Sequence, residues 1–171
     1  MVKPDTIRLL RECDAGIKMG VSAIEDVVDR VADKRFRRSL TDCAAEHDKL
    51  KAEIQALLDK YGDEGKNPNP IAQGMSHMKT GMKLGMDDSD QTIADLITDG
   101  CNMGVKSLSQ YLNQYKAADE TSKNITKRLI ALEERLAVDI RGFLQVNNVK
   151  RPAPFGGRAF HVYMDGRVGK E

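Results

Sequence analysis

Residues 7–61 decide the fold, because they hold two consecutive stretches with the same rhythm of apolar side chains. Residues 7–31 read IRLLRECDAGIKMGVSAIEDVVDRV, and residues 36–61 read FRRSLTDCAAEHDKLKAEIQALLDKY. In both stretches an apolar residue recurs every three or four positions, a spacing that places side chains on one stripe of an α-helix. The stripe positions are Ile7, Leu10, Ile17, Val21, Ile24, Val28 and Val31, followed by Phe36, Leu40, Cys43, Leu50, Ile54, Leu57 and Tyr61. Each stretch therefore predicts a helix that buries one face.

The two helices are predicted to fold back on each other at a turn over residues 32–35. With the turn there, Val28 lies opposite Leu40 and Ile17 lies opposite Leu50. Apolar residues then meet at nearly every level along the pair. This match supports an antiparallel helical hairpin independently of the stripes themselves.

Two polar residues, Asp14 and His47, occupy positions within the stripes. Each needs a partner, because burying an unsatisfied polar or charged group is costly. In the hairpin His47 is level with Val21, which is seven residues, or ~10 Å along the helix, from Asp14. The two side chains are therefore not expected to pair with each other. We expect each to be satisfied by a backbone group, a neighbouring helix or water.

Two further apolar stripes follow, with a break near Ala118 and Asp119. Their positions are Ala94, Ile97, Cys101, Val105, Leu108, Leu112 and Tyr115, and then Ile125, Leu129, Leu132, Leu136, Ile140, Phe143 and Val146. Asp5 and the acidic run 87–90 are predicted to cap helix starts, and Gly62 to end the second helix in a left-handed conformation. The four long amphipathic stretches predict an all-α four-helix bundle.

The second and third long helices are joined by residues 63–89, far more than the roughly 2–8 residues that usually connect bundle neighbours. Residues 71–86 predict a short crossover helix that climbs ~24 Å, so the second and third helices are expected to run parallel. The stripe of this short helix is rich in methionine, at Met75, Met78, Met82 and Met86. These side chains are interpreted as adaptable core filling, with a docking face for a protein partner as the alternative.

The bundle pattern covers residues 1–146, and residues 147–171 form an irregular C-terminal tail rich in proline, glycine and basic side chains. One interpretation is a flexible tail, because such a composition rarely packs alone. The other is an arm whose Phe155, Phe160 and Tyr163 dock on the bundle or on a second subunit.

Composition excludes several classes of function. The 171 residues suit one domain, and the formal net charge of +1 gives no reason to expect nucleic acid as a partner. No run approaches the ~18 apolar residues of a membrane span, and residues 1–5 show no apolar signal core. The three cysteines lack the spacing of a disulfide framework. We expect a cytoplasmic protein with reduced thiols.

Four local phrases, together with the order of the helices, carry a resemblance to a known family. They are Asp14-Ala15-Gly16, Lys49-Leu50-Lys51-Ala52-Glu53-Ile54, Met75-Ser76-His77-Met78-Lys79 and Val138-Asp139-Ile140-Arg141. Over residues 5–146 the chain resembles an uncharacterised bacterial family of ferritin-like four-helix proteins, distantly related to rubrerythrin. The resemblance implies a ferritin-like bundle with one crossover connection.

A ferritin-like bundle raises the question of a di-metal centre, which needs inward carboxylates and a Glu-x-x-His pair on each of two helices. The residues three positions before His47, His77 and His161 are Ala44, Gly74 and Arg158. On the third helix, where relatives often carry glutamates, the inward positions are Thr98 and Cys101. The di-iron centre is therefore expected to be missing, and no cofactor is predicted.

An alternative site uses softer ligands. Cys43 and His47 are four residues apart on one helical face, and Cys101 falls at roughly the same depth, with Glu46 and Glu133 as border residues. Two thiolates and an imidazole favour zinc or copper over iron. The competing interpretation is that both cysteines are small buried hydrophobic residues.

Three Gly-x-x-x-Gly pairs occur, Gly16 with Gly20, Gly81 with Gly85 and Gly100 with Gly104. They would allow close backbone approach, for example of the first helix to the third. A nucleophile elbow, a phosphate loop and a dinucleotide fingerprint are all missing from the sequence, which lowers the expectation of an enzyme. The sequence therefore favours a non-catalytic structural or interaction protein that self-associates as a homo-oligomer such as a dimer. The alternative is a metal-binding protein.

Overall fold

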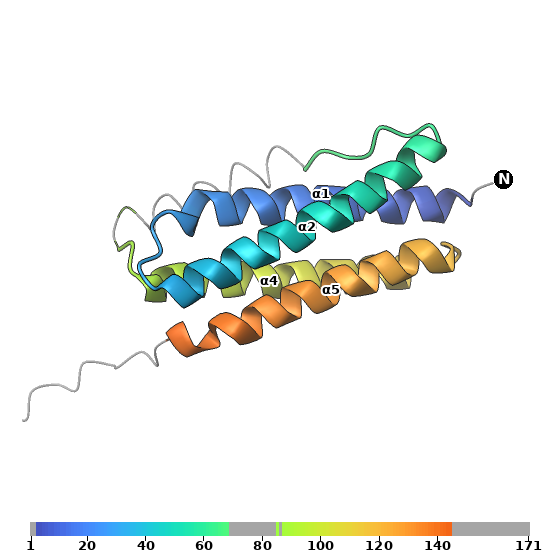
Figure 1. The fold of residues 1–171 in the computed structure, drawn as a ribbon. Helices are drawn as coiled ribbons and strands as arrows, with labels where there is room; N and C mark the ends of the chain where they lie inside the picture. The colour runs from blue at the N-terminus through green and yellow to red at the C-terminus, as the bar shows by residue number, and fades with distance from the viewer. Residues whose placement is uncertain (1–2, 69–84, 86, 145–171) are drawn as a thin grey trace, which may run out of the picture.

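Four α-helices lie side by side: α1 (Pro4–Val28), α2 (Lys34–Lys60), α4 (Asp90–Gln114) and α5 (Glu120–Ile140) (Figure 1). A short 3-10 helix, η1 (Arg141–Phe143), follows α5. The computed structural model describes residues 3–68, 85 and 87–144, and all regular secondary structure in these ranges is helical. The predicted all-α four-helix bundle is confirmed at this level.

Two predicted features fall outside the described residues. The first is the short helix predicted over residues 71–86, of which only Gly85 is described, together with its methionines at 75, 78, 82 and 86. The second is the tail at 147–171, with the aromatic residues proposed to dock from it.

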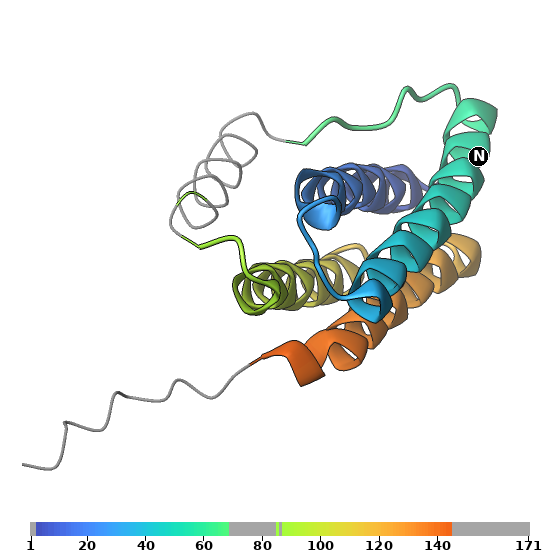
Figure 2. The same ribbon diagram turned by 60° about the vertical axis from the view of Figure 1, so that its left-hand side comes forward.

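The helix α1 packs against α2, α4 and α5, while α5 also packs against α2 and α4 (Figure 2). At one end of the bundle the Asp90 carboxylate accepts hydrogen bonds from the backbone N–H groups of Ala32 and Asp33, at 2.7 and 2.8 Å. At the other end the Thr6 hydroxyl accepts from the backbone N–H of Asp119 at 2.9 Å. Helices α2 and α4 therefore start at the same end and run parallel, the direction expected from the long connection.

Most predicted stripe residues in the described part are buried. The partly buried ones are Ile7, Val21, Val28, Leu57, Tyr61, Val105, Leu112, Tyr115 and Phe143. Seven buried core residues are not among the predicted stripe positions: Leu9, Cys13, Ala15, Val27, Leu58, Ile93 and Ala118. The buried face of α1 is wider than a single stripe because α2, α4 and α5 all pack against this helix.

Three of the four described α-helices, α2, α4 and α5, start at a side-chain cap with the expected chemistry. Asp33 accepts from the backbone N–H groups of Arg35 and Phe36, while Ser89 and Asp119 cap α4 and α5. Gly62 has φ +68°, which confirms the predicted left-handed end of α2. The cap predicted for Asp5 is wrong. The helix already starts at Pro4, whose missing N–H is not needed in the first turn, and the Asp5 carboxylate accepts from Ala117 N–H at 3.2 Å instead.

The end of the last helix also differs from the prediction. The apolar stripe extends to Val146, but α5 ends at Ile140 and the chain tightens into η1. Gly142 weakens a helix at this point, and the Phe143 ring stacks on Phe36 with centroids 4.8 Å apart. This contact between distant parts of the chain outweighs the local helical pattern.

Candidate functional site

His47 lies inside the bundle on α2 and uses both of its ring nitrogens. Its Nδ1 lies 2.9 Å from the Cys43 carbonyl oxygen and its Nε2 lies 2.9 Å from Oε1 of Glu133. A carbonyl oxygen only accepts hydrogen bonds, so Nδ1 carries a proton, and a proton on Nε2 completes an imidazolium paired with the carboxylate. Burial alone lowers the pKa of His47, but hydrogen bonds with Cys43 and Glu133 and the charge of Glu133 raise it to about 10.

Glu133 reaches His47 from α5, across the bundle. The His47 side chain is 1% exposed and that of Glu133 is 12% exposed, so the pair is largely shielded from water. Of the two glutamates expected at the border of a Cys/His site, Glu133 therefore takes part directly. Glu46 does not; it pairs with Lys49 at 2.6 Å on the surface, so its predicted border role is wrong.

Two thiols complete the cluster. The Cys43 sulfur lies 3.5 Å from His47 Nδ1. Cys101, on α4, is also buried, and its thiol pKa is raised first by burial and then by the charge and hydrogen bonding of Glu133. We call Cys43, His47, Cys101 and Glu133 the polar cluster. Three helices contribute to it, and it contains all three of the predicted candidate ligands.

The polar cluster is not arranged as a metal centre. Among the residues that the structure describes, no group of three or more histidine, cysteine, aspartate or glutamate side chains is placed to hold a metal ion. The His47 nitrogen that would face an ion is hydrogen-bonded to Glu133. A metal would have to replace this bond.

Glycines on α1 and α4 make room for the ion pair. A Cβ atom at Gly20 would lie 3.2 Å from His47 Nε2, and one at Gly104 would lie 3.6 Å from Cγ of Glu133. Cβ atoms at Gly16 and Gly100 would meet nothing within 4 Å. Helix α1 does pack against α4, as expected. The reason predicted for the glycines is wrong, however, because they accommodate side chains of the polar cluster and not the backbone of a facing helix.

Asp14 belongs to a separate site at the end of the bundle where α2 finishes. Its carboxylate is 1% exposed and accepts hydrogen bonds from Lys18 Nζ at 2.8 Å and from the Lys66 backbone N–H at 2.9 Å. Gly65 has φ +81°, and a Cβ there would lie 2.5 Å from Asp14 Oδ2. The prediction that Asp14 and His47 have different partners, each from a backbone group or a neighbouring helix, is confirmed.

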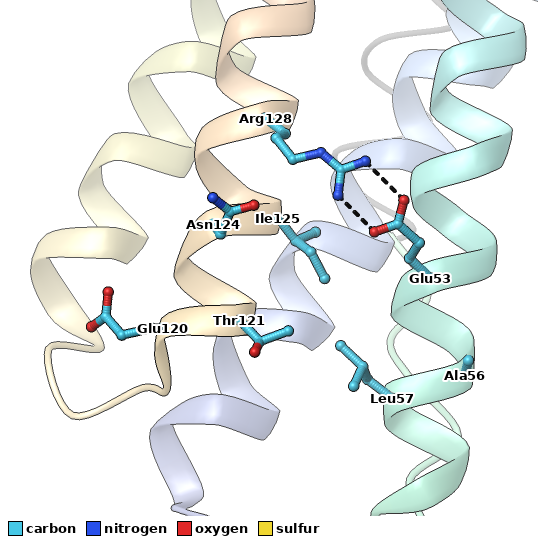
Figure 3. Close-up of a pocket in the computed structure, with 8 residues that line it drawn as sticks. All are labelled: Glu53, Ala56, Leu57, Glu120, Thr121, Asn124, Ile125 and Arg128. Carbon is cyan, nitrogen blue, oxygen red and sulfur yellow. Dashed lines mark hydrogen bonds and ion pairs between the residues drawn. The ribbon is translucent and has the colours of Figure 1, made fainter.

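A shallow groove of about 600 Å³ lies between α2 and α5 (Figure 3). The guanidinium of Arg128 and the carboxylate of Glu53 bridge it with two hydrogen bonds of 2.7 and 2.8 Å. The remaining lining is Ala56, Leu57, Glu120, Thr121, Asn124 and Ile125. It contains no histidine, cysteine or lysine and shares no residue with the polar cluster, so the groove is a separate feature.

Comparison with known proteins gives no match to any protein family, curated protein or solved structure. The ferritin-like resemblance therefore depends on the phrases quoted from the sequence. None of the described helices is long and apolar enough to cross a membrane.

Proposed function

We propose that this chain is a ferritin-like helical bundle with a non-catalytic structural or interaction role, which self-associates in the cytoplasm. The observation that carries the proposal is the direct His47–Glu133 ion pair at 2.9 Å. These ionisable side chains in the bundle interior satisfy each other. In this proposal the ion pair occupies the region where a ferritin relative would bind metal, and it stabilises the bundle.

The interaction role is supported by apolar side chains on the outside of the bundle. Met103 on α4 is 65% exposed and Val138 on α5 is 50% exposed. The tail at 147–171 and the methionines at 75, 78, 82 and 86 are further proposed contact surfaces. Each of these would bury apolar area in a homodimer or against a protein partner.

Light scattering of the full-length protein, combined with elemental analysis, tests this proposal. We expect a mass of about twice the 19.0 kDa of one chain and transition metals only at trace levels. Removal of residues 147–171 then distinguishes a dimer held by the tail from one held by the bundle surface. A strictly monomeric protein that carries one metal ion per chain would contradict the proposal.

The second candidate function is binding of zinc or copper by Cys43, His47 and Cys101. It is favoured by the meeting of two thiols and an imidazole from α2 and α4 around Glu133. Here the ion would displace Glu133 from His47. Elemental analysis of protein purified without chelators should then find a stoichiometric metal that Cys43→Ala loses. Trace levels in both proteins would reject this function.

A further inference from the structure

Within the polar cluster, three groups stand in an order that is known from nucleophilic chemistry. The Cys43 sulfur is 3.5 Å from His47 Nδ1, and His47 Nε2 is 2.9 Å from the Glu133 carboxylate. A thiol beside an imidazole that a carboxylate orients is the arrangement that activates cysteine nucleophiles. The Nδ1 proton is shared between the Cys43 sulfur and the Cys43 carbonyl oxygen, so it lies next to the sulfur atom.

The other two cysteines provide an internal comparison, because all three thiols are buried, at 0%, 5% and 4% exposure for Cys13, Cys43 and Cys101. Cys13 lies 3.2 Å from the Thr126 hydroxyl, and burial raises its pKa to about 11. Cys101 faces the negative charge of Glu133, which adds to the effect of burial in raising its pKa. Only Cys43 is hydrogen-bonded to a cationic side chain. Among the three thiols, only Cys43 therefore has a neighbouring group that can give a proton to a departing hydroxide, so Cys43 should react first.

The burial of Cys43 limits which reagents can reach its sulfur atom. Cys43 is 5% exposed, which excludes large electrophiles, and the groove between α2 and α5 does not reach it. The Glu133 side chain is 12% exposed and His47 is 1% exposed, so solvent meets this cluster at its Glu133 end. Only a reagent close to water in size is therefore expected to reach the Cys43 sulfur.

We propose that Cys43 is a thiol that reacts selectively with hydrogen peroxide, assisted by His47 and Glu133. The sulfur of Cys43 attacks one peroxide oxygen, so that an S–O bond forms and the O–O bond breaks. Sulfur gives up two electrons and becomes a sulfenic acid, while the departing hydroxide takes the Nδ1 proton of His47 and leaves as water. The proton of the Cys43 thiol replaces it on Nδ1, and His47 keeps its Nε2 proton on Glu133. The reaction is stoichiometric, so it is compatible with a non-catalytic bundle.

The test uses reduced full-length protein treated with hydrogen peroxide in the presence of dimedone, which traps sulfenic acids. After the reaction is stopped, each cysteine is quantified by peptide mass spectrometry. We expect Cys43 to be labelled at least about tenfold faster than Cys13 and Cys101. Cys43→Ser should abolish the fast adduct, and iodoacetamide, which is larger, should show no preference for Cys43.

The variant His47→Gln separates assistance from simple opening of the core. It should slow the labelling of Cys43 about tenfold while the rate at Cys13 stays unchanged. A variant that merely loosens the bundle would instead speed up labelling at all three cysteines. The decisive measurement is therefore the ratio of the labelling rate at Cys43 to the labelling rate at Cys13. Equal rates at the three thiols in the wild type, or an unchanged ratio in His47→Gln, would overturn the proposal. The labelling is done on metal-free protein, so that neither outcome depends on the second candidate function, and neither depends on the oligomeric state.

Discussion

His47 keeps its proton inside the bundle because Glu133 and the Cys43 carbonyl oxygen both accept from it. Its pKa is about 10 in the folded protein, against about 6.5 in an unfolded chain. The folded state therefore binds this proton more tightly. The stabilisation is complete below pH about 6.5 and is lost as the pH rises through about 10.

Urea unfolding at about pH 6 and about pH 8.5 should accordingly show a lower free energy of unfolding at the higher pH. Both values lie at or below the ordinary pKa of a thiol, about 8.5, which limits the contribution of Cys13 and Cys101. The control is His47→Gln, which should be less stable than the wild type at about pH 6 and nearly insensitive to pH in this range. Wild-type stability that is flat between the two values would contradict a protonated His47.

The glycines near the ion pair allow a matched test. A Cβ at Gly20 would lie 3.2 Å from His47 Nε2, whereas one at Gly16 would meet nothing within 4 Å. Gly16→Ala should stabilise the protein by up to about 1 kcal/mol, because alanine favours a helix. Gly20→Ala should not show this stabilisation, because its Cβ would crowd His47. Gly20→Leu and Gly104→Leu should destabilise the protein by about 1–3 kcal/mol through overpacking. The shift of the urea midpoint measures each effect, and equal shifts for Gly16→Ala and Gly20→Ala would contradict the crowding.

The sequence predicts part of this site and misses the rest for a physical reason. A histidine within an apolar stripe signals a buried polar group that needs partners, as His47 does. Its main partner is separated from it by 86 positions along the chain. The sequence places Glu133 at the border of the site, but it does not predict that Glu133 pairs directly with His47. The pairing depends on how α2 and α5 align, which hydrophobic spacing does not specify.

At the scale of the elements, the loop that follows α2 is held to α1 by one buried carboxylate. Asp14 accepts from the Lys66 N–H and from Lys18, and Lys18 Nζ also donates to the Lys66 carbonyl oxygen at 3.3 Å. Asp14→Ala leaves the Lys66 N–H without its acceptor and Lys18 without its carboxylate partner. We expect a loss of about 1.5–3 kcal/mol in the free energy of unfolding and faster hydrogen exchange at the Lys66 amide.

A surface ion pair on the same loop is the control. Arg11 pairs with Asp63 at 2.8 Å, but the arginine side chain is 47% exposed. Arg11→Ala should cost less than about 1 kcal/mol, because water and salt screen such pairs. If Arg11→Ala destabilised the protein as much as Asp14→Ala, the buried carboxylate would not be the main anchor.

The apolar stripes predict where the helices form. They do not predict where the helices end, because the ends depend on contacts with distant residues. The start of α1 is set by Pro4, and Asp5 is used by the α4–α5 connection through the Ala117 N–H. The end of α5 is set by the stacking of Phe143 on Phe36. By contrast Gly62 was predictable, because its left-handed backbone conformation is a local requirement. Local signals fix an end only where no distant residue competes.

At the scale of the whole molecule, α1 contacts α2, α4 and α5, and hydrogen bonds hold both ends of the bundle. Asp90 holds the α1–α2 turn, while Thr6 holds the start of α5 through the Asp119 N–H. With the 25 residues of α1 between them, the two ends are roughly 35 Å apart. The domain should therefore unfold as one cooperative unit although the two anchors do not touch each other.

Double mutants test this arrangement. Thr6→Val and Asp90→Ala each remove an acceptor from backbone N–H groups and should destabilise by about 0.5–3 kcal/mol. Because the two anchors are far apart, their effects should add within about 0.5 kcal/mol in urea unfolding. His47→Gln combined with Glu133→Gln should instead be clearly non-additive, because those side chains share one hydrogen bond. A large coupling energy between Thr6→Val and Asp90→Ala would mean that loosening one end of the bundle changes the packing at the other end. This result would contradict the view that each end is held separately.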